Sequence, residues 1–119
     1  MLNLDTHILI DALAGSLSKR EQSLLSGQPW SISAVVLWEL AKLVQLGRIE
    51  LDLNSVAFAH ALSRMRVWPL DLPVARQSAH LDFKSDPADE LIAATSIIHR
   101  VPLLTRDKRI LKSKLVPLA

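Results

Sequence analysis

Short apolar runs alternate along this chain with longer segments in which apolar residues recur every three or four positions. The short runs are typical of buried strands, and the longer segments are typical of helices that bury one face. The pattern predicts strands over residues 1–4, 30–32, 67–70, 101–105 and 115–118. It predicts helices over residues 6–14, 19–25, 34–46, 55–65, 73–81 and 86–98. This alternation indicates an α/β fold, which we expect to contain about five short parallel strands with helices on both faces.

The composition narrows the class of protein. The 119 residues are 50% hydrophobic and 22% charged, which is typical of a single globular domain over residues 1–119. No apolar stretch reaches the length of a membrane-spanning helix, and no basic segment precedes the apolar N-terminus, which Asp5 interrupts. We therefore expect a cytoplasmic protein that does not engage a membrane. The chain has no cysteine, so disulfides, thiolate zinc sites and cysteine nucleophiles are excluded.

Basic residues gather near the C-terminus although the formal net charge of the chain is only +2. The cluster consists of Arg106, Lys108, Arg109, Lys112 and Lys114. One interpretation is a solvated helix face followed by a short basic tail. The other is a patch that grips phosphates, and it gains weight because Asp107 lies inside the cluster.

Four acidic residues stand where an apolar run stops or a helix begins: Asp5, Glu39, Asp89 and Asp107. A carboxylate beside buried apolar segments is costly unless it is paired, protonated or bound to metal. Four carboxylates spread over the chain indicate one site that is assembled by folding. The cations that suit an all-carboxylate site are hard divalent ions such as Mg²⁺ or Mn²⁺.

Helix capping is the ordinary explanation for most of these acids. Asp5 and Asp86 stand at the starts of two predicted helices, and Asp107 can cap a short C-terminal helix. Asp89 lies three residues after Asp86, close to the spacing of a capping box. These positions also lie where the strands of a parallel sheet end, which is where ligands bind in such folds. Capping positions and active-site positions therefore coincide.

Glu39 has no capping explanation, because it lies inside a predicted helix that is apolar nearly all round. A buried glutamate there needs a partner, a proton or a metal ion. Lys42, three residues later, is the remaining structural partner, although such pairs are weak. Metal ions held by these carboxylates would suit hydrolysis of a phosphodiester, with Arg106, Lys108 and Arg109 at the rim of the site.

Five segments taken together resemble the PIN-domain family, in particular its VapC-like toxins. They are LDTHIL at residues 4–9, ISAVVLWE at 32–39, GRIEL at 47–51, DPADELIAAT at 86–95 and LLTRD at 103–107. The five segments follow one another in this order and spacing, and the resemblance covers essentially the whole chain. The resemblance implies a three-layer α/β/α sandwich with the activity of a metal-dependent ribonuclease. It also implies a homodimer held inactive by a cognate antitoxin, which would insert a basic side chain among the acids.

The resemblance also assigns roles to individual residues. It implies that Asp5, Glu39, Asp89 and Asp107 bind Mg²⁺ or Mn²⁺ and carry the catalysis. Asp86 is an auxiliary acid, and Thr6 and Thr105 flank two of the acids, where they can hydrogen-bond a ligand, water or carboxylate. Relatives often have arginine after the third acid, whereas this chain has Glu90. We interpret Glu90 as a solvated helix residue.

Two other functions fit the same pattern of elements. One is a PIN fold that binds RNA or an antitoxin without cleaving RNA. The other is a phospho-accepting receiver domain, which is disfavoured because Thr6 follows Asp5 where a receiver carries adjacent acids. The apolar segments 37–46 and 57–62 are candidates for a dimer or antitoxin interface, although core packing explains them equally well.

Overall fold

A parallel sheet of four strands forms the centre of the molecule in the computed structural model, which describes residues 1–119. The strands are β1 (Leu2–Leu4), β2 (Trp30–Ser33), β3 (Arg66–Trp68) and β4 (Leu103–Leu104). Their order across the sheet is β3-β2-β1-β4. The first strand therefore lies inside the sheet, with Asn3 beside Ser31 on one side and Leu103 on the other. Because β1 and β4 are neighbouring parallel strands, the segments that follow them begin side by side at the same edge of the sheet.

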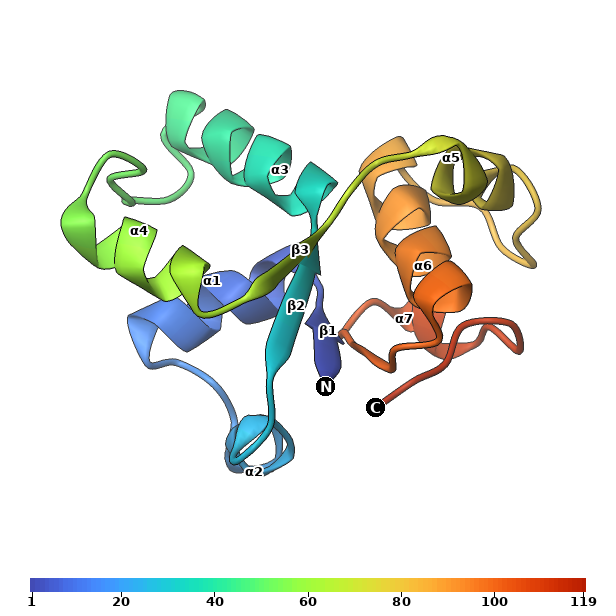
Figure 1. Ribbon diagram of the computed structural model, residues 1–119, viewed down its shortest axis with the longest axis horizontal. Coiled ribbons are helices and arrows are strands. Elements are labelled where there is room, and N and C mark those ends of the chain that lie inside the picture. The colour runs from blue at the N-terminus through green and yellow to red at the C-terminus, as the bar shows by residue number, and fades with distance from the viewer.

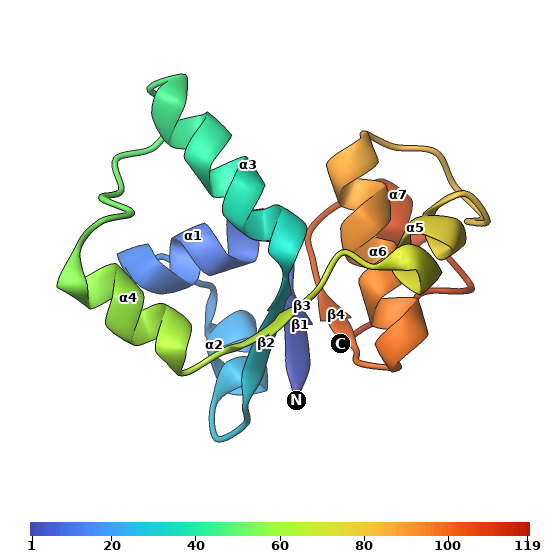
Figure 2. The same cartoon turned by 45° about the horizontal axis from the view of Figure 1, so that its top comes forward.

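Seven helices accompany the sheet. They are α1 (Thr6–Ala14), α2 (Lys19–Leu25), α3 (Ala34–Gln45), α4 (Val56–Ser63), α5 (Leu72–Ser78), α6 (Pro87–His99) and α7 (Lys108–Leu111). Figures 1 and 2 show α1, α3 and α4 on one side of the strands and α5, α6 and α7 on the other. The prediction of an α/β fold with helices on both faces of a parallel sheet is confirmed. No helix is long and apolar enough to cross a membrane.

The prediction of about five strands is wrong, because residues 115–118 form no strand. They make a single parallel bridge, between Leu118 and Leu103. Leu103 N donates to Pro117 O at 2.8 Å and Ala119 N donates to Leu103 O at 3.0 Å. Pro117 has no N–H to offer the sheet, which prevents a longer ladder from forming. The predicted strand over 67–70 also extends too far, because β3 ends at Trp68, directly before Pro69.

The core consists of apolar side chains from the strands and from the inner faces of α1, α3 and α6. Leu4, Ile8, Ile32, Val36 and Ile92 have no exposed surface. They come from five different elements, so their burial stabilises the whole sandwich at about 1.5–3 kcal/mol for each side chain. This packing fixes where each strand ends and where the next helix begins.

One polar cluster lies within this core and ties α6 to the sheet. Asn3 Nδ2 donates to Ser96 Oγ at 2.9 Å, and Ser31 Oγ donates to Asn3 Oδ1 at 3.2 Å. All three residues are buried, so their hydrogen bonds offset the cost of removing polar groups from water. The cluster connects β1, β2 and α6, and it thereby sets the position from which α6 presents its first turn.

Candidate active site at the carboxyl edge of the sheet

The four predicted acids all lie toward the carboxyl edge of the parallel sheet. Asp5 directly follows β1, and Asp107 follows β4 and precedes α7. Asp89 lies in the first turn of α6, and Glu39 lies in the second turn of α3. This is the edge at which open α/β sheets bind their ligands.

Asp5 is the most buried of the four acids, with 6% of its surface exposed. Its Oδ1 accepts a hydrogen bond from Thr6 N at 2.8 Å, and its Oδ2 accepts one from Thr105 Oγ1 at 2.6 Å. Hydrogen bonds of this kind to a carboxylate are among the stronger ones in proteins. Asp5 is thus both the N-cap of α1 and a carboxylate held in place by the residue that follows β4.

Glu39 is partly buried, and the hydroxyl of Thr6 donates a hydrogen bond to its Oε1. Burial raises the pKa of Glu39, and the negative charges of Asp89 and Asp5 raise it further, against the opposing effect of the Thr6 hydrogen bond. Lys42 does not pair with Glu39, because its Nζ donates to Gln45 Oε1 at 3.2 Å. The hydrogen-bond partner of Glu39 is therefore Thr6 of α1 and not Lys42.

Asp89 also lies near other negatively charged carboxylates. Ser85 Oγ donates to Asp89 Oδ2 at 3.0 Å. Burial nevertheless raises the pKa of Asp89, and the charges of Asp5, Asp107 and Asp86 add to the rise. Acids whose pKa values are raised by burial and by neighbouring carboxylates are typical of a functional site.

Asp107 caps α7 as well as facing the other acids. Its Oδ1 accepts hydrogen bonds from Arg109 N at 2.8 Å and Ile110 N at 3.2 Å. Its own N–H donates to Thr105 Oγ1 at 3.0 Å. The Thr105 hydroxyl therefore joins Asp5 to the segment that carries Asp107. Asp86 occupies the N-cap position of α6 but makes no capping hydrogen bond through its side chain.

The donors fit a hard divalent cation chemically, because they are carboxylate and hydroxyl oxygens. As the side chains are placed, no three acidic or histidine residues lie close enough together to hold one metal ion. Threonine or serine hydroxyls turn three of the carboxylates toward the protein, and Asp107 turns toward helix amides. Assignment of the four acids as metal ligands stays a prediction, and it requires the carboxylates to exchange these partners for the ion.

Arg106 has acidic partners that the sequence analysis did not anticipate. Its Nε and Nη2 donate to the two carboxylate oxygens of Glu21, both at 2.8 Å, and its Nη1 contacts Asp11 Oδ2 at 2.5 Å. The pair lowers the pKa of Glu21 to about 2. Lys108 and Arg109 are exposed and form no salt bridge. The role of Arg106, Lys108 and Arg109 in binding substrate stays a prediction.

Ser85, Glu21 and Asp11 are the neighbours of the site that sequence reasoning missed. Ser85 carried a signal, because it lies four residues before Asp89 and next to the predicted N-cap. Glu21 is three residues after Ser18 and closes a capping box with it, so its spacing indicates only a helix start. Its pairing with a residue 85 positions away left no signal in the local sequence.

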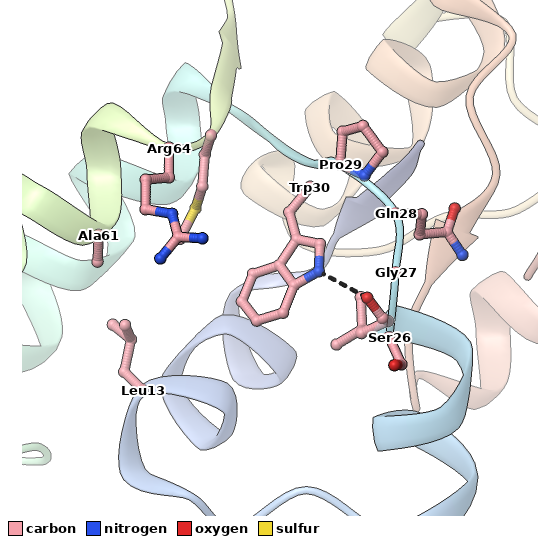
Figure 3. A pocket seen from close by; sticks show the side chains of 10 residues that line it. Leu13, Ser26, Gly27, Gln28, Pro29, Trp30, Ala61 and Arg64 are labelled. Atoms are coloured by element: carbon pink, nitrogen blue, oxygen red, sulfur yellow. Dashed lines mark hydrogen bonds between the residues drawn. The ribbon is translucent and has the colours of Figure 1, made fainter.

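Two cavities lie outside the acidic cluster. One of about 640 Å³ lies at the start of β2, between the loop before Trp30 and the facing residues Leu13 and Arg64, and none of the four acids lines it (Figure 3). Trp30 Nε1 donates to Leu25 O at 3.1 Å there. The other, of about 420 Å³, lies between α3 and the start of α6, with Trp38 and Pro87 in its lining. None of the four acids lines either cavity.

The sequence model of the PIN domain family matches residues 3–114. The chain therefore belongs to the PIN domain family. The earlier resemblance to this family is confirmed.

Individual relatives are similar to the chain along much of its length. "Ribonuclease VapC22" from Mycobacterium tuberculosis is 34% identical over 83 residues, which are 67% of this chain and 64% of that relative. The chain thus spans slightly less than two thirds of that relative in the alignment.

Solved structures have the same fold. The "Toxin-antitoxin complex from Klebsiella pneumoniae" matches with a TM-score of 0.72 at 23% identity, over 94% of this chain and 91% of that one. FitAcB from Neisseria gonorrhoeae matches with a TM-score of 0.65 at 25% identity, over 92% of this chain and 90% of that one.

Proposed function

We propose that this PIN domain is a divalent-metal-dependent endoribonuclease and the toxin of a toxin–antitoxin pair. The observation that carries the proposal is the acidic cluster at the carboxyl edge of the sheet, where burial and neighbouring carboxylates raise the pKa values of Glu39 and Asp89. Such a cluster is costly for the fold alone, so a cation is its natural complement. The similarity to a protein named ribonuclease supports the same activity.

Asp5, Glu39, Asp89 and Asp107 would hold the cation, either Mg²⁺ or Mn²⁺. When bound, the cation supplies an activated water, a clamp on the scissile phosphate and stabilisation of the leaving oxygen. The hydroxyls of Thr6 and Thr105 donate hydrogen bonds to Glu39 and Asp5, respectively. The cation also offsets the repulsion between the carboxylates and an incoming phosphate.

RNA would approach from the side of α7. Lys108 and Arg109 are exposed at the start of this helix, one and two residues after Asp107. Neither side chain is engaged by a carboxylate, so both are available to contact phosphates. Both residues follow Asp107 in the chain, so their positive charges would lie at the rim of the site.

The cognate partner would be an antitoxin that places a basic side chain among the acids, which satisfies the same negative field as the cation. We also propose a homodimer. Apolar side chains on and near α3 stay exposed in the single chain: Trp38 is 56% exposed, Leu46 64% and Leu70 51%. A second copy or the antitoxin would bury such side chains.

RNA cleavage by the purified full chain tests the proposed activity. Single-stranded RNA should be cut in Mg²⁺ or Mn²⁺, and a chelator should stop the reaction. Asp5→Asn should reduce cleavage to background while the protein stays folded. Asp52→Asn is the matched control, because Asp52 is an exposed acid that only caps a turn through Asn54 N at 2.9 Å.

The alternative is a catalytically silent PIN domain that binds RNA or an antitoxin. One observation favours it: no three acids lie close enough together to hold a metal ion as placed. Binding of RNA without cleavage in any divalent metal, with equal affinity in the wild type and in Asp5→Asn, would establish the silent module and overturn the nuclease proposal.

A further inference from the structure

Residues 105–107 contribute two side chains to the proposed site, those of Thr105 and Asp107, but belong to no helix or strand. They lie between β4, which ends at Leu104, and α7, which begins at Lys108. Thr105 reaches Asp5 from this segment, and Asp107 reaches the acidic cluster. A segment without a hydrogen-bond ladder of its own depends on side chains to hold its position.

Arg106, at the centre of the segment, provides the side-chain contacts that hold it in position. Its guanidinium binds Glu21 on α2 through two parallel hydrogen bonds of 2.8 Å and Asp11 on α1 at 2.5 Å. The Arg106 side chain is 44% exposed, whereas that of Glu21 is only 9% exposed. A forked pair to a buried carboxylate has fixed geometry, unlike a mobile surface ion pair.

Glu21 is also held by hydrogen bonds that do not involve Arg106. Its Oε1 accepts a hydrogen bond from Ser18 N at 2.9 Å, and Ser18 Oγ accepts one from Glu21 N at 3.1 Å. This reciprocal capping box anchors the carboxylate to the first turn of α2. Arg106 therefore joins the site segment to a rigid helix end, 85 residues earlier in the chain.

The charges around Arg106 disfavour a phosphate contact. Two carboxylates already face a single guanidinium, and three of its nitrogen atoms donate to them. A phosphate would have to displace a carboxylate and would meet the negative charge left behind. Lys108 and Arg109 have no such competitors.

We propose that Arg106 is a positioning residue that, through Glu21 and Asp11, fixes the segment carrying Thr105 and Asp107, and that it does not bind RNA. The inference rests on the proposed function for its effect on catalysis, but the structural hold itself does not depend on RNA cleavage. Groups that orient metal-binding side chains typically affect metal affinity or activity by about 10–100-fold.

Matched variants separate the two roles of Arg106. If Arg106 positions the segment, Arg106→Gln and Glu21→Gln should each lower kcat by about tenfold and leave the affinity for RNA unchanged. The double variant should be no worse than Arg106→Gln alone, because Arg106→Gln already removes the contact with Glu21. If Arg106 binds RNA, Arg106→Gln alone should weaken RNA binding and lower its salt dependence by about one ion, while Glu21→Gln should not weaken it. That second pattern would overturn the proposal.

Amide hydrogen exchange measures the positioning without any cleavage assay. The N–H groups of Asp107, Arg109 and Ile110 donate to Thr105 and Asp107 side chains, so they report the order of the segment. Arg106→Gln and Glu21→Gln should both speed exchange at these amides, and Lys108→Gln should not. Unchanged exchange in a folded Glu21→Gln protein would overturn the proposal.

Two further variants keep the test decisive. Asp11→Asn replaces Glu21→Gln as the test if Glu21→Gln fails to fold. It removes only the more exposed partner of Arg106, so it should speed exchange at the same three amides to a smaller extent. Arg106→Lys keeps the charge but loses the fork, and it should restore little of the protection. If the wild type proves inactive on RNA, the proposed function fails, while the exchange measurements still decide the role of Arg106.

Discussion

Replacement of Thr105 with valine removes a hydroxyl that serves two partners and changes the side-chain shape little. Thr105 is 7% exposed, donates to Asp5 Oδ2 at 2.6 Å and accepts from Asp107 N at 3.0 Å. A hydrogen bond to a charged group contributes about 1.5–3 kcal/mol, and an unpaired N–H costs about 1–3 kcal/mol when buried. Because Asp107 is partly exposed, water satisfies part of the second loss. We expect Thr105→Val to lower the free energy of unfolding by about 2–4 kcal/mol.

Thermal and urea unfolding of the purified chain measure this loss. For a domain of this size, about 2–4 kcal/mol corresponds to a decrease in Tm of about 8–16 °C. Thr95→Val is the matched control, since Thr95 is fully buried but donates only to Leu91 O within its own helix. That control should cost less than about 1 kcal/mol, and Thr105→Ser should recover most of the loss. Equal destabilisation by Thr105→Val and Thr95→Val would refute the bridging role of Thr105.

Two further predictions concern the acids themselves. Glu39→Gln should raise the Tm of the metal-free protein at pH 7, because the raised pKa of Glu39 means that folding disfavours its ionised form. Wild-type stability linked to this group is fully present below the unfolded pKa of about 4.3 and is lost as pH rises through the folded pKa. The advantage of Glu39→Gln should therefore vanish near pH 4, and Glu50→Gln, at an exposed acid, should show none; an advantage that grows in acid would contradict the assignment. Asp107→Ala should cost about 1 kcal/mol through loss of the α7 cap, whereas Asp107→Asn should keep the cap. Both Asp107 variants should bind Mn²⁺ more weakly in calorimetry, and unimpaired binding in either would exclude Asp107 as a ligand.

The sequence was sufficient to predict the elements whose signals are local. Ser33, directly before the predicted helix over 34–46, accepts a hydrogen bond from Val35 N at 3.3 Å and caps α3. Gly15, directly after the predicted helix over 6–14, ends α1 in the left-handed conformation with φ of 72°, where glycine avoids steric cost. Residues 115–118 have the apolar character of a strand, but strand formation also requires free N–H groups at the sheet edge. Pro117 removes one of them, so the apolar pattern alone was misleading.

Prediction of the site was limited in the same way. The four acids could be selected because each occupies a costly or capping position in its own segment. The partners that orient them come from distant segments: Thr105 is 100 positions from Asp5, and Glu39 is 33 positions from Thr6. Arg106 looked like part of a basic patch because neighbouring residues are also basic. Its actual partners, Asp11 and Glu21, lie 95 and 85 positions away along the chain, and no local pattern encodes such a pairing.

Direct titration of Mn²⁺ into the purified chain by calorimetry is the measurement that tests the central claim, namely that four dispersed carboxylates form one cation site. The account predicts saturable binding by the wild type and by Asp52→Asn, and binding weakened at least about tenfold, the lower end seen even for groups that only orient ligands, in Asp5→Asn. Failure of the wild type to bind Mn²⁺, or equal binding by Asp5→Asn, would contradict it.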